Sequence, residues 1–264
     1  MKSFNSLTKK KKEKIPIIMI TCYNFYTAKI IDSIESIDAI LVGDSMANVE
    51  YGYDLTIPIT VEQILDRVKI VSNNTINKPV IADMPFLSYG IDIRDDILNC
   101  GRMIKEGNAN AVKIEGGREK CELIKKLVDI GIAVMGHIGL KPQHYNIEGG
   151  YKIAGKTDKE IDELLIDAKA LEDAGVFSII LECVTDEASK IITENLKIPT
   201  IGIGSGKNCD GQIAVINDLL GLSSYIPSFT KKYIDLNSIV KDKLNEWCND
   251  VLQKKYPEKW FNKK

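Results

Sequence analysis

The sequence predicts an α/β protein whose βα units close into a (β/α)8 TIM barrel. Short apolar runs recur along the chain, separated by stretches long enough for a helix, which is the pattern of buried parallel strands. Several runs end in an acidic or basic residue, and such barrels keep their chemistry at the carboxyl ends of the strands. The 264 residues also match one barrel of about 250 residues better than two smaller domains.

The apolar runs locate the strands. We expect strands over residues 16–20, 39–42, 79–82, 111–114, 132–135, 177–181 and 199–203, and a weaker eighth over 223–226. An open doubly wound sheet is the alternative, but such a sheet usually carries a glycine-rich turn after its first strand. Here the first strand is followed by Thr21-Cys22-Tyr23-Asn24, which contains no glycine. The barrel is therefore favoured.

Amphipathic segments between the strands predict the helices. In residues 158–174 the apolar side chains fall at helical spacing, and Gly175 follows as a natural stop. Residues 119–130 repeat this pattern before Gly131. A further helical face is predicted from the apolar positions of residues 239–252.

The chain begins with a basic stretch, in which residues 9–14 hold five lysines and one glutamate. An arm that binds nucleic acid or a membrane would show this pattern, but the net charge of -2 gives no long-range attraction to either. We therefore interpret the stretch as a solvated helical lead-in to the first strand. The expected organisation is one barrel domain over 1–264, with 1–14 as the basic lead-in and 237–264 as a C-terminal helical extension.

The composition bounds the compartment and the partners. The six cysteines include no Cys-x-x-Cys pair, which favours free thiols in a reducing compartment over disulfides or a zinc site. The N-terminus has no signal-peptide apolar core, and no apolar run approaches about 18 residues. We expect a cytoplasmic protein that binds neither nucleic acid nor membrane.

Three carboxylates follow consecutive strands. Asp44, Asp83 and Glu115 end the second, third and fourth predicted strands, which lie about 4.8 Å from their neighbours. Three such charges repel one another unless a cation neutralises them, and oxygen ligands with open positions suit Mg²⁺. The alternative for any one of them is a helix cap or a surface salt bridge.

Two further charged residues could complete a reactive site. Lys113 shares a strand face with Glu115 and would contact either a substrate oxygen or a neighbouring carboxylate in an ion pair. Glu182 ends the sixth strand, across the barrel from the metal carboxylates, where a general base is required; a buried ion pair is the alternative. His137 ends the fifth strand and could donate to substrate or serve as a satisfied buried histidine, whereas His144 receives no role.

Two loops and a glycine-rich segment accompany these residues. The connections over 46–60 and 138–157 are long for βα turns and follow strands, so lids that exclude water are expected there. Gly202, Gly204 and Gly206 resemble a phosphate-binding loop, although close backbone approach is the favoured role. Together the parts indicate enolate chemistry on an α-keto acid, with Mg²⁺ and Lys113 holding the negative charge.

The motifs that carry this chemistry resemble those of the ketopantoate hydroxymethyltransferase family, from about residue 21 to residue 231. The similar segments are Leu41-Val42-Gly43-Asp44-Ser45, Ala82-Asp83-Met84-Pro85-Phe86, Val112-Lys113-Ile114-Glu115-Gly116-Gly117, Gly136-His137-Ile138-Gly139-Leu140, Gly149-Gly150-Tyr151-Lys152, Leu181-Glu182-Cys183-Val184, Ile201-Gly202-Ile203-Gly204-Ser205-Gly206, Asp210-Gly211-Gln212 and Pro227-Ser228-Phe229.

The resemblance implies a barrel of the phosphoenolpyruvate/pyruvate superfamily type and transfer of a hydroxymethyl group from 5,10-methylenetetrahydrofolate to 3-methyl-2-oxobutanoate, giving 2-dehydropantoate for pantothenate and coenzyme A synthesis. It implies Mg²⁺ at Asp44, Asp83 and Glu115 and a proton acceptor at Glu182. The implied contacts of the keto acid are Asp44, Ser45, Asp83 and Lys113. It also implies a homo-oligomer, a decamer in this family.

Some positions differ from the family pattern. Asn24 stands where Asp is usual, Tyr53 and Leu55 replace His and Ser, Asn217 stands at a position often held by His, and residues 46–48 differ from Leu-Gly-Met. Two alternatives remain open. One is a relative of the isocitrate lyase or phosphonomutase type, against which residues 136–142 lack the loop cysteine typical of those enzymes. The other is a metal-binding scaffold without turnover.

Overall fold

The structure, a computed structural model, describes residues 4–259. The chain divides into two compact units, Met1–Val215 and Ile216–Lys264, and each is described by itself. The division falls directly after the last barrel strand. The predicted organisation of one barrel domain with a helical extension from residue 237 remains a prediction.

Eight parallel strands form a closed barrel in chain order, with the last strand paired to the first. The strands are β1 Ile17–Thr21, β2 Ala39–Val42, β3 Val80–Asp83, β4 Ala111–Glu115, β5 Val134–Gly139, β6 Ser178–Glu182, β7 Thr200–Ile203 and β8 Gly211–Ala214. The predicted barrel is therefore confirmed. Asp83, Glu115 and Glu182 are the last residues of their strands, one position beyond the predicted apolar runs.

The eighth strand lies over residues 211–214, so its prediction over 223–226 is wrong. Two features hid it. The strand has the sequence Gly-Gln-Ile-Ala, which contains no apolar run, and its first residue must be glycine. A Cβ on Gly211 would lie 2.4 Å from the carbonyl oxygen of Ile17, because β8 packs closely against β1.

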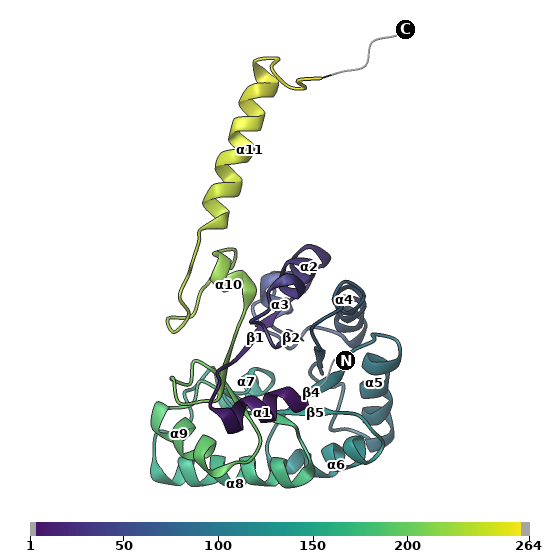
Figure 1. Cartoon of the computed structure of the whole chain (residues 1–264), viewed down its shortest axis with the longest axis vertical. Coiled ribbons are helices and arrows are strands. Elements are labelled where there is room, and N and C mark those ends of the chain that lie inside the picture. The colour runs from purple at the N-terminus through teal and green to yellow at the C-terminus, as the bar shows by residue number, and fades with distance from the viewer. Residues whose placement is uncertain (1–3, 260–264) are drawn as a thin grey trace. The chain divides into compact units, whose positions relative to one another are not determined.

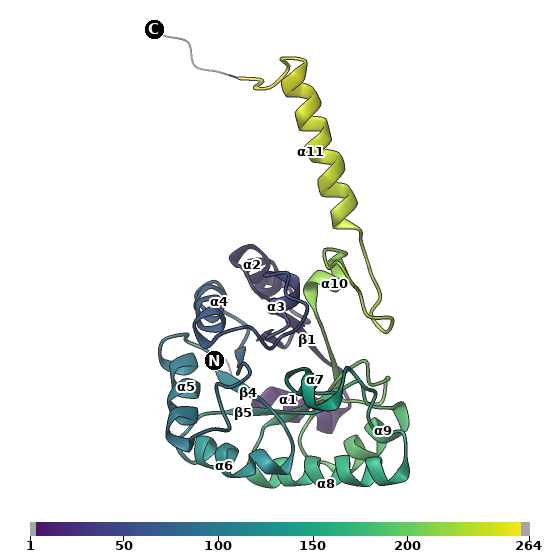
Figure 2. The same ribbon diagram turned by 180° about the vertical axis from the view of Figure 1, so that it is seen from behind.

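Helices connect the strands on the outside of the barrel (Figure 1), and Figure 2 shows the same arrangement from behind. The connecting helices are α2 Phe25–Ser33, α3 Met46–Val49, α4 Val61–Asn73, α5 Ile93–Lys105, α6 Cys121–Asp129, α7 Tyr145–Glu148, α8 Asp158–Ala174 and α9 Asp186–Asn195, with 3-10 turns η1 Arg118–Lys120 and η2 Pro142–His144; α1 Asn5–Glu13 precedes β1. The predicted bounds of α8 are confirmed at both ends. Thr157 caps its start by accepting from the Glu160 amide, and Gly175 adopts the left-handed conformation at its end.

Helix α1 closes the amino-terminal end of the barrel. Leu7, 1% exposed, joins the core cluster formed by the inward side chains of the strands, and Phe4 stacks on Phe177 at 4.1 Å. Lys10 and Lys11 form ion pairs of 2.7 and 2.8 Å with acidic residues that directly precede β2 and β8, Asp38 and Asp210. The basic lead-in is helical as predicted, but it is not merely solvated. Because α1 covers the amino-terminal ends of the strands, it does not cover their carboxyl ends, where the charged residues lie.

The second unit contains α10 Ile216–Leu220 and α11 Leu236–Leu252. Helix α11 confirms the predicted C-terminal helix, and Asp235 caps it by accepting from the Ser238 amide. Its apolar residues, Trp247 among them, are exposed. Trp260, the second tryptophan of the chain, lies outside the described residues. No helix within residues 4–259 has the length and apolar character that crossing a bilayer requires.

Candidate active site

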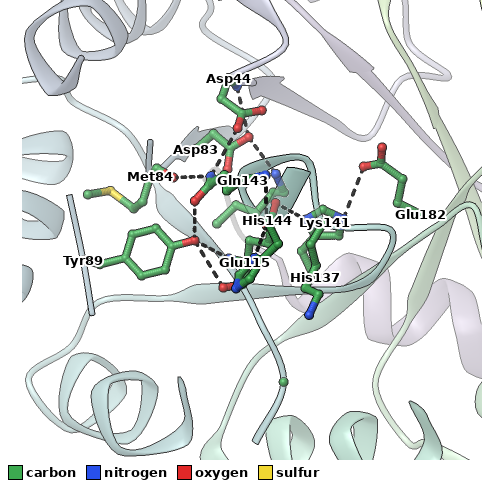
Figure 3. Close-up of polar contacts among 12 residues, drawn as sticks. Asp44, Asp83, Met84, Tyr89, Glu115, His137, Lys141, Gln143, His144 and Glu182 are labelled. Carbon is green, nitrogen blue, oxygen red and sulfur yellow. Dashed lines mark hydrogen bonds and ion pairs between the residues drawn. The ribbon is translucent and has the colours of Figure 1, made fainter. Parts of the chain in front are cut away.

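The polar residues singled out in the sequence meet at the carboxyl ends of the strands (Figure 3). The strand register explains the meeting. Asp83 pairs across the sheet with Lys113, Glu115 pairs with His137, and Glu182 pairs with Gly139. Asp83, Glu115 and Glu182 therefore end their strands at the level of residues within the neighbouring strands, two of which are the polar residues Lys113 and His137. Asp44 follows β2 by two residues and reaches the same region.

Asp83 and Lys113 form a buried ion pair. The Lys113 Nζ lies 2.6 Å from Oδ2 of Asp83, and the two residues are 5% and 1% exposed. The same Oδ2 accepts from the backbone amide of Asp44 at 3.1 Å. The other oxygen, Oδ1 of Asp83, is buried and has no hydrogen-bond partner. The ion-pair alternative for Lys113 is thus present in the structure, and a substrate contact remains a prediction.

Burial and charge act in opposite directions on this pair. Burial raises the pKa of Asp83 to about 7, with the ammonium of Lys113 lowering it and the charge of Asp44 raising it. Burial by itself lowers the pKa of Lys113, but the negative charges of Asp83, Asp44 and Glu115 outweigh it and raise the pKa above its usual range. Lys113 therefore stays protonated and supplies a permanent positive charge to the site.

Glu115 is held through one of its two carboxylate oxygens. Its Oε1 accepts from the backbone amide of Gln143 at 3.2 Å and lies 3.1 Å from Nδ1 of His144. Its Oε2 is buried without a hydrogen bond, and Nδ1 of His137 lies 3.5 Å away without the alignment of one. One oxygen of Glu115 thus remains available in the interior of the site.

His137 lies between Glu115 and Glu182. Its Nε2 lies 3.2 Å from Oε2 of Glu182 without the alignment of a hydrogen bond, and its side chain is fully buried. The Glu182 side chain is 23% exposed, so it opens toward the mouth of the barrel. Cys183, which follows it, has a left-handed backbone with φ 47°. The chain therefore changes direction after Glu182. Figure 3 shows the Glu182 side chain apart from Asp44 and Asp83.

Ser45 directly follows Asp44, and its hydroxyl points to the loop after β1. Its hydroxyl is 2.8 Å from that of Tyr23, a fully buried residue in the loop after β1. Asn24, the next residue, caps helix α2 by accepting from the Thr27 amide at 3.1 Å. Asn and Asp fill this role about equally well, which explains locally why Asn is tolerated where Asp is usual.

The glycine loop after β7 surrounds a carboxylate of the chain itself. Asp186 accepts from the Lys207 amide at 3.2 Å and from the Asn208 side chain at 2.9 Å. A Cβ on Gly206 would collide with the Asp186 carboxylate, and φ 72° also favours glycine there. Close backbone approach, the role favoured from sequence, is what the loop shows.

Sequence reasoning missed three residues around the carboxylates. Gln143 and His144 contact the Glu115 carboxylate, and Tyr89 contacts the Glu115 backbone and the Gln143 side chain. They come from the loops after β3 and β5, where no hydrophobic period fixes the backbone. The proline at the start of η2 is the one local signal near Gln143 and His144, and it predicts a turn without predicting what the turn contacts.

The carboxylates at the strand ends have the donor chemistry of a divalent-cation site. Among residues 4–259, no three His, Cys, Asp or Glu side chains stand as a ready-made metal site. Asp83 Oδ1 and Glu115 Oε2 are nevertheless buried oxygens without hydrogen-bond partners, and native proteins seldom leave such atoms unsatisfied. Carboxylate oxygens are the donors that Mg²⁺ prefers. The donor chemistry therefore fits Mg²⁺, provided that side chains shift to bring the oxygens together.

Known proteins with similar sequences belong to the family that the sequence motifs resemble. The family model described as ketopantoate hydroxymethyltransferase matches residues 2–259. The 3-methyl-2-oxobutanoate hydroxymethyltransferase of Thermosipho melanesiensis is 49% identical over 253 residues, covering 96% of this chain and 94% of that protein.

Two solved structures share the fold at low sequence identity. 2,3-Dimethylmalate lyase, a PEP mutase/isocitrate lyase superfamily member, superposes with a TM-score of 0.59 at 16% identity, covering 100% of this chain and 92% of its own. Phosphonopyruvate hydrolase in complex with oxalate and Mg²⁺ gives a TM-score of 0.61 at 13% identity, covering 81% of each chain. These structural similarities confirm the barrel type. The sequence similarity identifies the family within that fold. The chain belongs to the ketopantoate hydroxymethyltransferase family.

Proposed function

We propose that this enzyme transfers a hydroxymethyl group from 5,10-methylenetetrahydrofolate to 3-methyl-2-oxobutanoate, giving 2-dehydropantoate, a step of pantothenate and coenzyme A synthesis. The names of its relatives support the acceptor and the transfer. The observation that carries the mechanism is the arrangement of charge. A cluster of carboxylates and one lysine lies at the ends of β2 to β4, a separate, partly exposed carboxylate lies on β6, and buried His137 lies between them.

The carboxylate cluster is the proposed metal site. Asp44, Asp83 and Glu115 would hold Mg²⁺, since two of them present unpartnered buried oxygens. When bound, the ion supplies positive charge beside the keto and carboxylate oxygens of the substrate.

Lys113 would orient the keto acid and hold charge that develops on its oxygen. The ammonium has three hydrogen-bond donors, and its contact with Asp83 uses one of them. Its raised pKa keeps it protonated through the reaction. Ser45 and Asp44, side by side after β2, would complete the contacts to the substrate.

Glu182 is the proposed proton acceptor. It would take the proton from C3 of the keto acid, while the electron pair of that C–H bond forms the C2–C3 double bond and places charge on the keto oxygen. Water adds to the methylene carbon of the folate donor, both C–N bonds of that carbon break with one proton passing to each nitrogen, and tetrahydrofolate leaves behind formaldehyde. C3 then attacks the formaldehyde carbon to form the C–C bond, and the oxygen that came from water takes the proton held by Glu182 and becomes the hydroxyl. His137, 3.2 Å from Glu182, would hold the carboxylate in place during both steps.

The proposal is tested by following the product. The purified protein is incubated with 3-methyl-2-oxobutanoate, Mg²⁺ and 5,10-methylenetetrahydrofolate in water enriched in ¹⁸O, and the acid products are measured by mass spectrometry. We expect 2-dehydropantoate that carries one ¹⁸O from water and forms only with the folate donor. A control without protein measures how much ¹⁸O enters the ketone group of the keto acids by exchange with water, so that this label can be subtracted from the label in the new hydroxyl group. Breakdown of the keto acid without donor would instead favour the lyase-type alternative, and binding without any product would favour the scaffold.

A further inference from the structure

Gln143 contacts the ends of three barrel strands at once. It lies in η2, the turn after β5, and is 5% exposed. Its Nε2 donates to Oδ2 of Asp44 at 3.2 Å and to the carbonyl of Met84 at 3.0 Å, its Oε1 accepts from the Tyr89 hydroxyl at 2.8 Å, and its backbone amide donates to Oε1 of Glu115 at 3.2 Å. Figure 3 shows Gln143 between Asp44 and Glu115.

Tyr89 fixes the direction in which this amide points. The Tyr89 hydroxyl accepts from the Glu115 backbone amide at 3.2 Å. Its single hydrogen has two acceptors within reach, the Glu115 carbonyl at 3.2 Å and Oε1 of Gln143 at 2.8 Å, and the contact to Gln143 is the shorter one. In the flipped orientation, the Gln143 oxygen would face the Asp44 carboxylate and the Met84 carbonyl, both of which can only accept. Two hydrogen bonds would be lost, so the observed orientation is the stable one.

The turn that carries Gln143 is itself anchored. The Leu140 amide donates to the carbonyl of Glu182 at 2.8 Å. At Gly139, with φ 101°, a Cβ would lie 2.3 Å from that same carbonyl oxygen. The turn is thus fixed to β6 at its start, and Gln143 extends from it to the carboxylates of β2 and β4.

We propose that Gln143 is a positioning residue for the metal site, with Tyr89 as the lock on its amide. Gln143 engages one oxygen of Asp44 and one oxygen of Glu115. It thereby holds the two carboxylates at a set spacing with their second oxygens directed elsewhere, and the second oxygen of Glu115 is buried and unpartnered. The inference rests on the proposed function, because it takes these two carboxylates as Mg²⁺ ligands.

Mg²⁺ binding to the full-length protein, measured by isothermal titration calorimetry, tests the proposal. We expect Gln143→Met to weaken Mg²⁺ affinity by about 10- to 100-fold, the usual effect of losing a hydrogen bond to a metal-binding side chain. Tyr89→Phe should also weaken it, and by less when Gln143→Met is already present, because both act through the same amide. Ser178→Ala, which removes a buried hydroxyl that donates to the Pro199 carbonyl at 2.9 Å, is the matched control and should leave affinity unchanged.

The outcomes separate this inference from the proposed function. If the wild-type protein binds Mg²⁺, Asp83→Asn does not, and Gln143→Met binds as the wild type does, the positioning role is overturned while the metal site stands. If the wild-type protein shows no Mg²⁺ binding, the proposed site and the positioning role both fall. Should Gln143→Met not fold, Tyr89→Phe decides alone, since it removes only a hydroxyl; unchanged affinity in that variant overturns the lock and with it the proposal.

Discussion

Lys113 and Asp83 stand side by side on β4 and β3, and their charged atoms meet at 2.6 Å in the buried interior of the barrel. The pair places a fixed positive charge among three carboxylates. Its arrangement has consequences for stability, for metal affinity and for the reaction itself.

Removing Lys113 should cost stability. Lys113→Met leaves Asp83 buried without its partner, and breaking a buried pair in this way typically costs about 3–5 kcal/mol. Urea unfolding without Mg²⁺ measures the free energy of unfolding. The double variant Lys113→Met with Asp83→Asn should recover much of the loss, because it removes both charges. Equal stability of Lys113→Met and the wild type would show that the pair contributes nothing.

Mg²⁺ affinity should depend on pH through Asp83. Burial raises the pKa of this carboxyl from 3.8 to about 7. Between these two pH values the folded protein without metal keeps a proton on Asp83 that the unfolded chain has already lost. The contribution of this group to stability therefore falls as pH rises from about 4 through 7. Mg²⁺ requires the ionised form and competes with that proton, which predicts weaker Mg²⁺ binding below pH 7.

Titration calorimetry at pH 6, 7 and 8 in two buffers of different ionisation enthalpy measures both quantities. We expect affinity to rise with pH and protons to be released on binding at pH 6 and 7. Asp83→Asn, which cannot titrate, should bind weakly with a much flatter pH dependence. Affinity that stays level across this range in the wild-type protein would contradict the assignment of Asp83.

The exposed face of α11 predicts self-association. Val240, Leu244, Trp247 and Val251 fall at helical spacing and are 43% to 56% exposed, and a large apolar stripe of this kind usually has a partner. The family resemblance implies a decamer. Light scattering coupled to size-exclusion chromatography should give a mass several times 29.4 kDa, and Leu244→Lys should lower it. A monomeric mass for the wild-type chain would rule the prediction out.

The barrel and the charged residues at its strand ends could be predicted because the short apolar runs locate the strands and, with them, the residues that follow each strand. Once 80–83 or 178–182 is a buried strand, its terminal Asp or Glu must face the open end. The prediction of a strand failed where the sequence has no apolar run. Strand β8 contains a glycine and no apolar run, and Leu7 is the one residue of the lysine-rich helix α1 that the structure buries.

The contacts that hold the carboxylates could not be predicted for a related reason. Tyr89, Gln143 and His144 lie on loops whose paths depend on turn geometry and on tertiary contacts at the site. The two histidines of the chain lie 7 residues apart in sequence, yet both have Nδ1 near the same Glu115 carboxylate, at 3.5 and 3.1 Å. Only the folded loop brings them together.

The most direct test of the central claim follows the C3 proton of 3-methyl-2-oxobutanoate by proton NMR in D₂O, with protein, Mg²⁺ and tetrahydrofolate. The account predicts that the wild-type protein exchanges this proton for deuterium, that EDTA stops the exchange, and that Glu182→Gln binds the keto acid without exchanging it. Wild-type-like exchange in Glu182→Gln would remove Glu182 as the base. No exchange in the wild-type protein with bound keto acid would contradict the proposed enolisation.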